Sequence, residues 1–372
     1  QMVSCVRLDG SIKQFRIQKM FGYLGLKRIE IEEAEAGDII AIAGLADISV
    51  GETVCEVGAE EALPILRVDE PTLQMKFGTN TSPFVGREGK FLTASKIQER
   101  LFKETERDVS LKVVRDEGES WIVSGRGELH LSILLENMRR EGYEFQVSKP
   151  KVIMQEIDGV LCEPVEELVI DVPEDFVGPV MEKIGKRKGE LLNMLPPTKG
   201  YSRLEFKIPS RGLLGYRTEF LTDTKGNGIM NSVISGFEPF AGDIETRGQG
   251  VLVAFETGTA VTYGLYNAQD RGALFIGAGT PVYEGMIVGI NPKPDDITVN
   301  VCKKKHVTNM RSAGADDAMR LTPPLTFSLE QCLEFVEDDE LCEVTPQSIR
   351  LRKKILNNDL RAKTVAKAKK DV

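Results

Sequence analysis

The order of predicted strands and helices repeats once in this chain, and this repeat constrains the fold more than any other feature of the sequence. Each copy reads β-α-β-β-α-β: the first runs from a strand at 72–79 to one at 144–147, and the second from 165–172 to 228–235. This is the order of the split-βαβ, or ferredoxin-like, arrangement. Because the two copies support each other, we predict two ferredoxin-like modules within an α+β, multidomain fold.

The clearest local pattern is a strand-to-helix junction at residues 124–131, inside the first copy. Gly125 and Gly127 flank Arg126 where the chain must turn, and the residues that follow show the period of a helix with one buried face. The apolar positions of that face are Leu131, Leu134, Leu135 and Met138. We interpret the glycines as permitting a tight turn, and His130 as a packing residue rather than a catalytic one.

The residues on either side of the repeat are richer in short strands. Residues 1–67 contain too few strands to close a barrel, and we predict half of a β-barrel whose other strands precede residue 1. After Pro239, apolar runs at 250–255, 260–265, 272–276 and 286–290 predict a β-rich domain, and residues 328–336 have the pattern of a helix. The predicted domains are 1–67, 68–150, 151–240 and 241–356, followed by a basic tail, 357–372, predicted to be disordered or a frayed helix.

Cysteine content and hydropathy bear on the compartment. The six cysteines show no CxxC pair and no dense framework, which favours reduced thiols and a cytoplasmic protein. No apolar run approaches the roughly 20 residues that span a bilayer, so we expect no membrane partner.

A search for catalytic chemistry finds two weak patterns. The glycines of Gly86-Arg-Glu-Gly89 are too close together for a phosphate loop, and Phe91 stands where such a loop needs a magnesium-binding Ser or Thr. Cys302 and His306 have the spacing of metal ligands, but no second pair completes a set of four. We therefore expect no catalytic residue, nucleotide-binding residue, metal or cofactor in this chain; a metal or hydrolytic site at Cys302 and His306 is the alternative.

Binding chemistry is better supported, although a net charge of −9 does not suggest a nucleic-acid binder as a whole. Nine Lys and Arg against two acids fall in residues 183–217, and a second basic run covers 303–311. Lys and Arg interleaved with Asn and Thr suit phosphate contacts together with polar contacts to bases or sugars. We predict RNA contacts by Lys303, Lys304, Lys305, Thr308, Asn309, Arg311, Lys186, Arg187, Lys188, Lys199, Arg211, Arg217 and Arg271.

The alternative binding function depends on the opposite charge. Residues 330–343 contain seven acids and no base, and this acidic run suits a structural adaptor that binds other proteins. The two hypotheses differ in their consequence, because a protein-binding adaptor would keep its partner after RNase treatment.

Several of these segments together resemble the C-terminal part of the BipA/TypA translational GTPases, which are related to elongation factor G. Residues 33–45 resemble the second half of the barrel that follows the GTPase domain, and residues 124–131 resemble the strand-to-helix junction of the third domain. Arg187-Lys188-Gly189 resembles domain V, whereas the segments 211–217, 269–272 and 308–311 resemble BipA/TypA itself. The four predicted domains are accordingly expected to be domain II-like, domain III-like, domain V-like and BipA/TypA-specific.

The resemblance implies a ribosome-associated GTPase that acts in stress responses, low-temperature growth and assembly of the large subunit. Its implied partners are the ribosome, ribosomal RNA and A-site tRNA, with the loop 303–311 facing RNA and residues 183–217 making a second contact. The phosphate loop, switch segments and Asn-Lys-x-Asp motif of such proteins do not occur in this sequence. GTP and Mg²⁺ are therefore expected in an absent N-terminal domain, and this chain alone is expected not to hydrolyse GTP.

Overall fold

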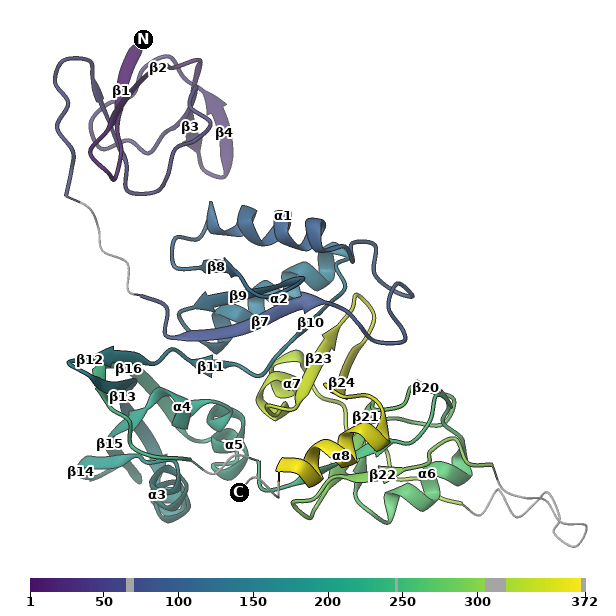
Figure 1. Ribbon diagram of the computed structural model, residues 1–372. Helices are drawn as coiled ribbons and strands as arrows, with labels where there is room; N and C mark the ends of the chain where they lie inside the picture. Colours follow the sequence, from purple (N-terminus) through teal and green to yellow (C-terminus); the bar gives the residue numbers. More distant parts are fainter. Residues whose placement is uncertain (65–69, 245–246, 305–318, 369–372) are drawn as a thin grey trace, which may run out of the picture. The chain divides into compact units, whose positions relative to one another are not determined.

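The computed structural model describes residues 1–64, 70–244, 247–304 and 319–368 (Figure 1). The chain divides into two compact units, residues 1–69 with 105–110 and residues 70–104 with 111–372. Each unit has its own hydrophobic core: a small one around Val3, Cys5 and Phe15 in the first, and three larger ones in the second.

The first unit contains two three-stranded antiparallel sheets, with the strand orders β2-β1-β6 and β4-β3-β5. Its strands are β1 (Met2–Val6), β2 (Ile12–Arg16), β3 (Lys19–Leu24), β4 (Lys27–Glu30), β5 (Ala41–Ala43) and β6 (Thr53–Glu56). A hairpin turn at Asp9 and Gly10 joins β1 to β2, and Gly10 has the positive φ of 81° that glycine tolerates in a turn. Within residues 1–64 the sheets do not close a barrel, as predicted for half of one.

The first predicted β-α-β-β-α-β module is confirmed in the second unit. Its elements are β7 (Leu73–Thr79), α1 (Ala94–Thr105), β8 (Lys112–Arg115), β9 (Ser120–Gly125), α2 (Glu128–Glu141) and β10 (Phe145–Val147). The strands pair antiparallel in the order β10-β7-β9-β8. Helix α2 buries Leu131, Leu134, Leu135 and Met138, the face predicted from their spacing.

Strands from two later parts of the chain extend this sheet. Strand β11 (Lys151–Val152) pairs with β7, and the hairpin of β23 (Glu340–Val344) and β24 (Ile349–Lys353) adds to the free edge of β10. Figure 1 shows β23 beside β10. From the sequence, residues 340–353 are expected in the C-terminal domain because they lie within its predicted range, 241–356. A pairing between residues so far apart leaves no local pattern.

The core of this module is shared with helix α7 (Leu329–Phe335), which confirms the helix predicted at 328–336. Ser328 and Gln331 form a capping box at its start, because each side chain bonds to the backbone N–H of the other residue. Phe77 and Phe145 stack with 5.8 Å between ring centroids, and Trp121 is 1% exposed. Residues that are distant in the sequence therefore stabilise one core.

The second module repeats the arrangement in residues 160–239. Its main elements are β13 (Val160–Pro173), α3 (Val177–Lys186), β14 (Glu190–Thr198), β15 (Tyr201–Pro209), α4 (Ser210–Leu213), α5 (Tyr216–Asp223) and β16 (Ile229–Pro239). The strand order is β16-β13-β15-β14, again antiparallel, and β12 (Gln155–Ile157) forms a hairpin with β13. A separate core lies between the sheet and its helices, with Leu168, Ile170, Ile184 and Phe206 among its members.

The C-terminal segment forms a four-stranded sheet of its own, with the order β19-β21-β17-β22. Its elements are β17 (Gly250–Ala254), β18 (Gly258–Thr259), α6 (Thr262–Gln269), β19 (Ala273–Leu274), β20 (Pro281–Val282), β21 (Ile287–Asn291) and β22 (Ile297–Val299). The strand predicted at 260–265 is wrong, because α6 occupies most of that range. Val261, Thr262 and Tyr263 favour strands locally, but the helix buries Leu265 and Ala268, three residues apart.

The tail is helical over most of its length, which excludes disorder, one of the two predicted alternatives, for those residues. Residues 358–368, predicted to be disordered or frayed, form helix α8 (Asn358–Ala368). The Asn357 side chain accepts the backbone N–H of Leu360 at 3.0 Å, and Arg361 donates to the carbonyls of Ile355 and Leu356. These contacts order its first turn. Neither α8 nor any other helix of the described residues is long and apolar enough to cross a membrane.

Candidate functional site

The basic run at 303–311 is described at its first two residues. Lys303 and Lys304 are exposed and directly follow the buried Val301 and the half-buried Cys302. Lys305, Thr308, Asn309 and Arg311, the other predicted contacts of this run, lie outside the described residues, as does His306. The chain is described again from residue 319, where Arg320 is exposed.

Helix α6 holds the chain at both ends of residues 305–318. At its start, the Val261 N–H donates to the Val301 carbonyl at 3.0 Å, and a Cβ on Gly264 would come within 2.2 Å of that same oxygen. At its end, the Gln269 side-chain amide donates to the Arg320 carbonyl at 3.1 Å and accepts the Thr322 N–H at 3.1 Å.

The cations at these two ends are open to solvent. Lys303 and Lys304 lie by the start of α6, and Arg271, another predicted contact, is exposed two residues beyond its end. Arg320 lies at the same end, because Gln269 binds its carbonyl. For these four side chains, no ion pair is seen within the part of the chain that the structure describes. They are free to meet an anionic partner.

The second predicted surface, residues 183–217, divides into two kinds of cation. Arg187 lies over the Tyr216 ring at 5.1 Å, and it donates to the carbonyls of Gly212 and Leu214 and to the Glu219 carboxylate. Lys183 pairs with Glu219 at 2.6 Å and with Asp223 at 2.7 Å. These side chains hold α3 against α5.

Arg211, another of the predicted contacts, is held by partners within the chain. Its guanidinium binds both oxygens of Glu163, which is 1% exposed, and donates to the Gly242 carbonyl. The Arg211 guanidinium also lies 4.5 Å from the centre of the Phe240 ring. Because a buried carboxylate needs a partner, Arg211 has a structural task that the sequence does not reveal.

The remaining predicted contacts of this surface are exposed. Lys186 pairs with Glu182 one helical turn away, at 2.7 Å. Lys188 and Lys199 occupy turns with φ of 65° and 55°, and Arg217 lies on the outer side of α5. No ion pair is seen for Lys188, Lys199 or Arg217 among the described residues. The structure therefore leaves these three cations available for a partner and gives Arg187 and Arg211 internal ones.

A cleft of about 920 Å³ is lined by α3, α5, α7 and the residues around β11. The cations that line it are already paired: Lys149 with Glu337 at 2.7 Å, Lys151 with Asp338 at 2.6 Å, and others with acids named above. Arg247 binds Glu340, which is fully buried and also accepts from Lys353 at 2.9 Å. The cleft is therefore not an open site for an anion.

These same contacts account for much of the acidic run 330–343. Glu337, Asp338 and Glu340 have the cation partners just described; Asp339 pairs with Lys353 at 2.8 Å, and Glu343 pairs with Arg350 at 3.0 Å. Glu334 accepts the Thr218 hydroxyl at 3.0 Å. Most acids of this run already have a partner within the chain, although Asp338 and Asp339 are exposed, so the geometry gives the protein-binding adaptor little support.

Glu128, in the first turn of α2, faces the cleft. Burial, assisted by the charge of Glu334 and opposed by a hydrogen bond from the Gly215 N–H, raises the pKa of the Glu128 carboxyl to about 7. Burial also raises the pKa of Glu334. A carboxyl that titrates near neutral pH occurs in catalytic sites. The neighbours of Glu128, however, are Gly215 and Glu334, which belong to the packing around α5 and α7.

The glycine loop at 86–89 binds an anion that belongs to the protein. The N–H groups of Gly86 and Gly89 donate to the two oxygens of the Glu144 carboxylate, at 3.0 and 2.9 Å. Glu144 is fully buried and also accepts from the Asn80 amide at 2.8 Å. The loop is therefore built around an internal carboxylate in the position where a phosphate loop would hold a nucleotide.

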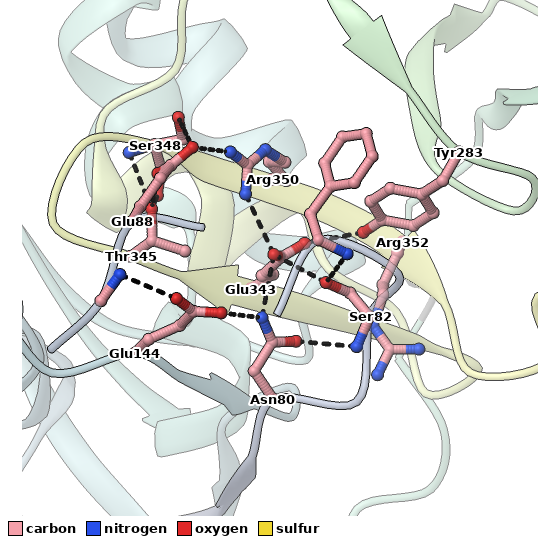
Figure 2. A network of polar contacts seen from close by, with 12 residues as sticks. Asn80, Ser82, Glu88, Glu144, Tyr283, Glu343, Thr345, Ser348, Arg350 and Arg352 are labelled. Atoms are coloured by element: carbon pink, nitrogen blue, oxygen red, sulfur yellow. Dashed lines mark hydrogen bonds and ion pairs between the residues drawn. The ribbon is translucent and has the colours of Figure 1, made fainter. Parts of the chain in front are cut away.

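A buried polar network continues from Glu144 to Glu343 (Figure 2). Figure 2 shows Asn80 between the two carboxylates, with its amide also 2.9 Å from Glu343. Glu343 accepts from Ser82 at 2.8 Å and from the Tyr283 hydroxyl at 2.7 Å, and burial raises the pKa of that tyrosine. Since every oxygen of both carboxylates has a donor, this network joins structural elements and leaves no reactive group open.

His130 and Cys302, the other described candidates for catalysis, also lack the surroundings of a reactive group. His130 Nδ1 accepts the Arg126 N–H at 3.2 Å, a contact within the strand-to-helix junction. Burial raises the pKa of the Cys302 thiol, which disfavours the thiolate that metals bind. Within the described ranges, no group of three or more His, Cys, Asp or Glu side chains could hold a metal ion.

Three segments of the chain match known protein families. Residues 92–149 match "Elongation Factor G, domain III", residues 160–248 match "Elongation factor G C-terminus", and residues 249–358 match "TypA/BipA C-terminal domain". The matches follow one another along the second unit in the order expected from the sequence.

Curated proteins named "Large ribosomal subunit assembly factor BipA" align along nearly the whole chain. The Bacillus subtilis protein is 56% identical over 371 residues, 99% of this chain and 61% of that protein. Identity is 52% with the Synechocystis protein, covering 95% of this chain and 59% of that one, and 50% with the Escherichia coli K12 protein, covering 97% and 60%. The chain thus spans about three fifths of the length of these relatives.

Similarity to solved structures is more distant. A crystal structure from Thermus thermophilus matches 64% of this chain and 51% of its own, with a TM-score of 0.38 and 17% identity. At that level the similarity says nothing about function. The matched segments and the identities along nearly the whole sequence are decisive: the chain belongs to the BipA/TypA family.

Proposed function

We propose that this chain is the RNA- and ribosome-binding portion of a translational GTPase that acts in assembly of the large ribosomal subunit. The observation that carries the proposal is the set of exposed cations at the two ends of α6, Lys303, Lys304, Arg271 and Arg320, on an element that fixes the chain on both sides of residues 305–318. Exposed cations on a fixed scaffold suit phosphate contacts.

The names of the relatives support the ribosomal part of this proposal. Proteins that are 50% to 56% identical are named large ribosomal subunit assembly factors. We extend ribosome binding to this chain, and we assign the RNA contacts to Arg320 and to the predicted cations that have no ion-pair partner among the described residues: Lys188, Lys199, Arg217, Arg271, Lys303 and Lys304.

The finer parts of the proposal concern the whole protein. GTP and Mg²⁺ are proposed as its ligands, outside the residues described here, so the geometry of this chain contributes binding rather than hydrolysis. A contact with A-site tRNA, a role in stress or low-temperature growth and a cytoplasmic location are proposed on the family resemblance.

Co-sedimentation of the purified chain with ribosomes tests the proposal. The double variant Lys303→Ala/Lys304→Ala is expected to bind several-fold more weakly at low salt. Each lost phosphate contact lowers the dependence of log affinity on log salt by about 0.7 to 0.9, so two contacts lower it by roughly 1.4 to 1.8.

A matched control is Lys96→Ala/Lys103→Ala, which removes the same charge from the exposed surface of α1. This control is expected to bind like the unaltered chain. Equal binding by both double variants would show that charge loss at 303 and 304 has no specific effect and would contradict the proposal. Association that RNase treatment leaves unchanged would favour the protein-binding adaptor instead.

A further inference from the structure

We propose that the outward face of α6 is a stacking platform for an unpaired RNA base, with Tyr266 as the stacking side chain. This inference rests on the proposed function, because it requires that the chain bind RNA. It adds a specificity: contact with a base as well as with phosphates, and a preference for single-stranded over duplex RNA.

The two faces of α6 differ in kind. The inner face buries Leu265 and Ala268 in the core of the C-terminal segment, and Gly264 packs on the backbone of Val301. The outer face carries Tyr266, which is 38% exposed, and the exposed Asn267. A tyrosine on the solvent side of a firmly packed helix has a fixed backbone and a ring that is open to a partner.

Cations lie close to this tyrosine. Tyr266 and Gln269 are three residues apart and so lie on the same side of the helix, and Gln269 binds the backbone of Arg320 and Thr322. Arg271 follows the end of the helix by two residues, and its N–H donates to the Ala268 carbonyl at 2.9 Å, which keeps its backbone beside the last turn. Lys303 and Lys304 lie near the other end, about 12 Å away for a helix of eight residues.

This combination matches single-stranded RNA in particular. Aromatic rings hold unstacked bases by their faces, whereas neighbouring cations hold the backbone. The Asn267 amide donates to the Tyr263 carbonyl at 2.8 Å, which fixes an Asn of the kind that reads base edges. A duplex keeps its bases stacked on one another, so it can use the cations but not the tyrosine.

One acid lies beside the platform. Asp270 is exposed and follows Tyr266 by four residues, so it lies on the same side of the helix and repels a phosphate there. We therefore place the phosphates at the cations and the base over the tyrosine. The variant Asp270→Asn is expected to tighten RNA binding.

Fluorescence anisotropy with two RNA probes tests the inference on the whole 372-residue chain. One probe is a labelled, unstructured oligouridine of about 12 nucleotides, and the other is an RNA duplex of about 12 base pairs. Tyr266→Ala is expected to weaken binding of the single strand at least about fivefold and to leave the salt dependence unchanged. Duplex binding is expected to stay the same, and Tyr266→Phe is expected to bind the single strand like the unaltered chain.

Tyr23→Ala is the matched control, since Tyr23 is 54% exposed in β3. Circular dichroism checks that the surface variants fold. If the unaltered chain binds neither probe, the proposed function itself fails. If Lys303→Ala/Lys304→Ala weakens binding but Tyr266→Ala does not, the proposed function stands and the platform is overturned. Equal losses of affinity for the single strand and the duplex in Tyr266→Ala would also overturn it. So would a weaker association of Tyr266→Ala with ribosomes that is the same before and after RNase treatment, because it would indicate a protein partner.

Discussion

Gly89 donates its backbone N–H to the buried Glu144 carboxylate across 2.9 Å, and no side chain other than hydrogen fits at this glycine. A Cβ there would lie 2.3 Å from the Glu144 Cβ and 2.8 Å from its Oε2. The glycine is therefore required by the close approach of loop and carboxylate. A loop that resembles a phosphate-binding motif in sequence is here part of the first module's own packing.

Gly89→Ala is accordingly expected to destabilise the first module by at least about 1–3 kcal/mol, the usual effect of forcing extra volume into a packed site. Urea unfolding followed by the fluorescence of Trp121, the single tryptophan, measures it. Gly78→Ala is the control in the same module, because its Cβ would come no closer than 3.6 Å to another atom. Similar urea midpoints for the two variants would contradict the packing argument.

Arg211 and Arg217 provide a second test, because both were predicted as RNA contacts and the structure gives them different surroundings. Arg211→Ala leaves Glu163 buried without its cation and is expected to cost about 3–5 kcal/mol. Arg217→Ala removes an exposed side chain and is expected to change stability by less than about 0.5 kcal/mol. Urea unfolding followed by circular dichroism compares them; a stable Arg211→Ala variant would show that Glu163 has another partner.

Glu128 predicts a dependence of stability on pH. Its pKa, raised from 4.5 to about 7 by burial, means that the folded protein binds this proton more tightly than the unfolded chain. The resulting stability is fully present below about pH 4.5 and is lost as pH rises through about 7. The free energy of unfolding is expected to fall by up to about 3 kcal/mol over this range.

Glu128→Gln is expected to flatten most of that fall, and a smaller slope is expected to remain from Glu334. Urea midpoints measured from about pH 5 to about pH 8 with the Trp121 signal provide the comparison. The surface variant Glu99→Gln is the control, since the hydrogen bond from Lys96 lowers the pKa of Glu99 and this carboxyl therefore stays ionised over the whole range. An unchanged slope in Glu128→Gln would show that another group titrates.

The local patterns predicted the elements well and the long-range pairing poorly. The spacing of Leu131, Leu134, Leu135 and Met138 fixes which face of α2 is buried, because that spacing depends only on helix geometry. The pairing of β23 with β10 depends on residues about 200 positions apart and leaves no mark in either segment. Helix α6 was missed because Val261 to Tyr263 favour strands, although the spacing of Leu265 and Ala268 was a signal for the helix.

The sequence predicted that the candidate site is basic, but it did not predict which of the basic residues remain available to a partner. In sequence, Arg187 and Arg211 look the same as Lys188 and Arg217, and only the fold shows that the first two have carboxylate and carbonyl partners. The partner of Arg211 lies 48 residues away, at Glu163. Composition can locate a basic region, whereas burial decides which of its cations remain available.

Gln269 provides a last prediction, because this uncharged residue fixes the backbone of Arg320 beside the proposed RNA-binding surface. Its amide binds the Arg320 carbonyl and the Thr322 N–H, each at 3.1 Å. Gln269→Ala removes both bonds and releases Arg320 from α6, so it is expected to weaken RNA binding a few-fold. The slope of log affinity against log salt is expected to fall by less than about 0.7, the value for one lost phosphate contact. Gln269→Glu separates the two bonds, since it keeps an acceptor for Thr322 and loses the donor to Arg320. Anisotropy across a salt series measures both variants, and Gln14→Ala, an exposed glutamine in β2, is the control. Affinity equal to that of the control would show that Arg320 does not need this anchor to contact RNA.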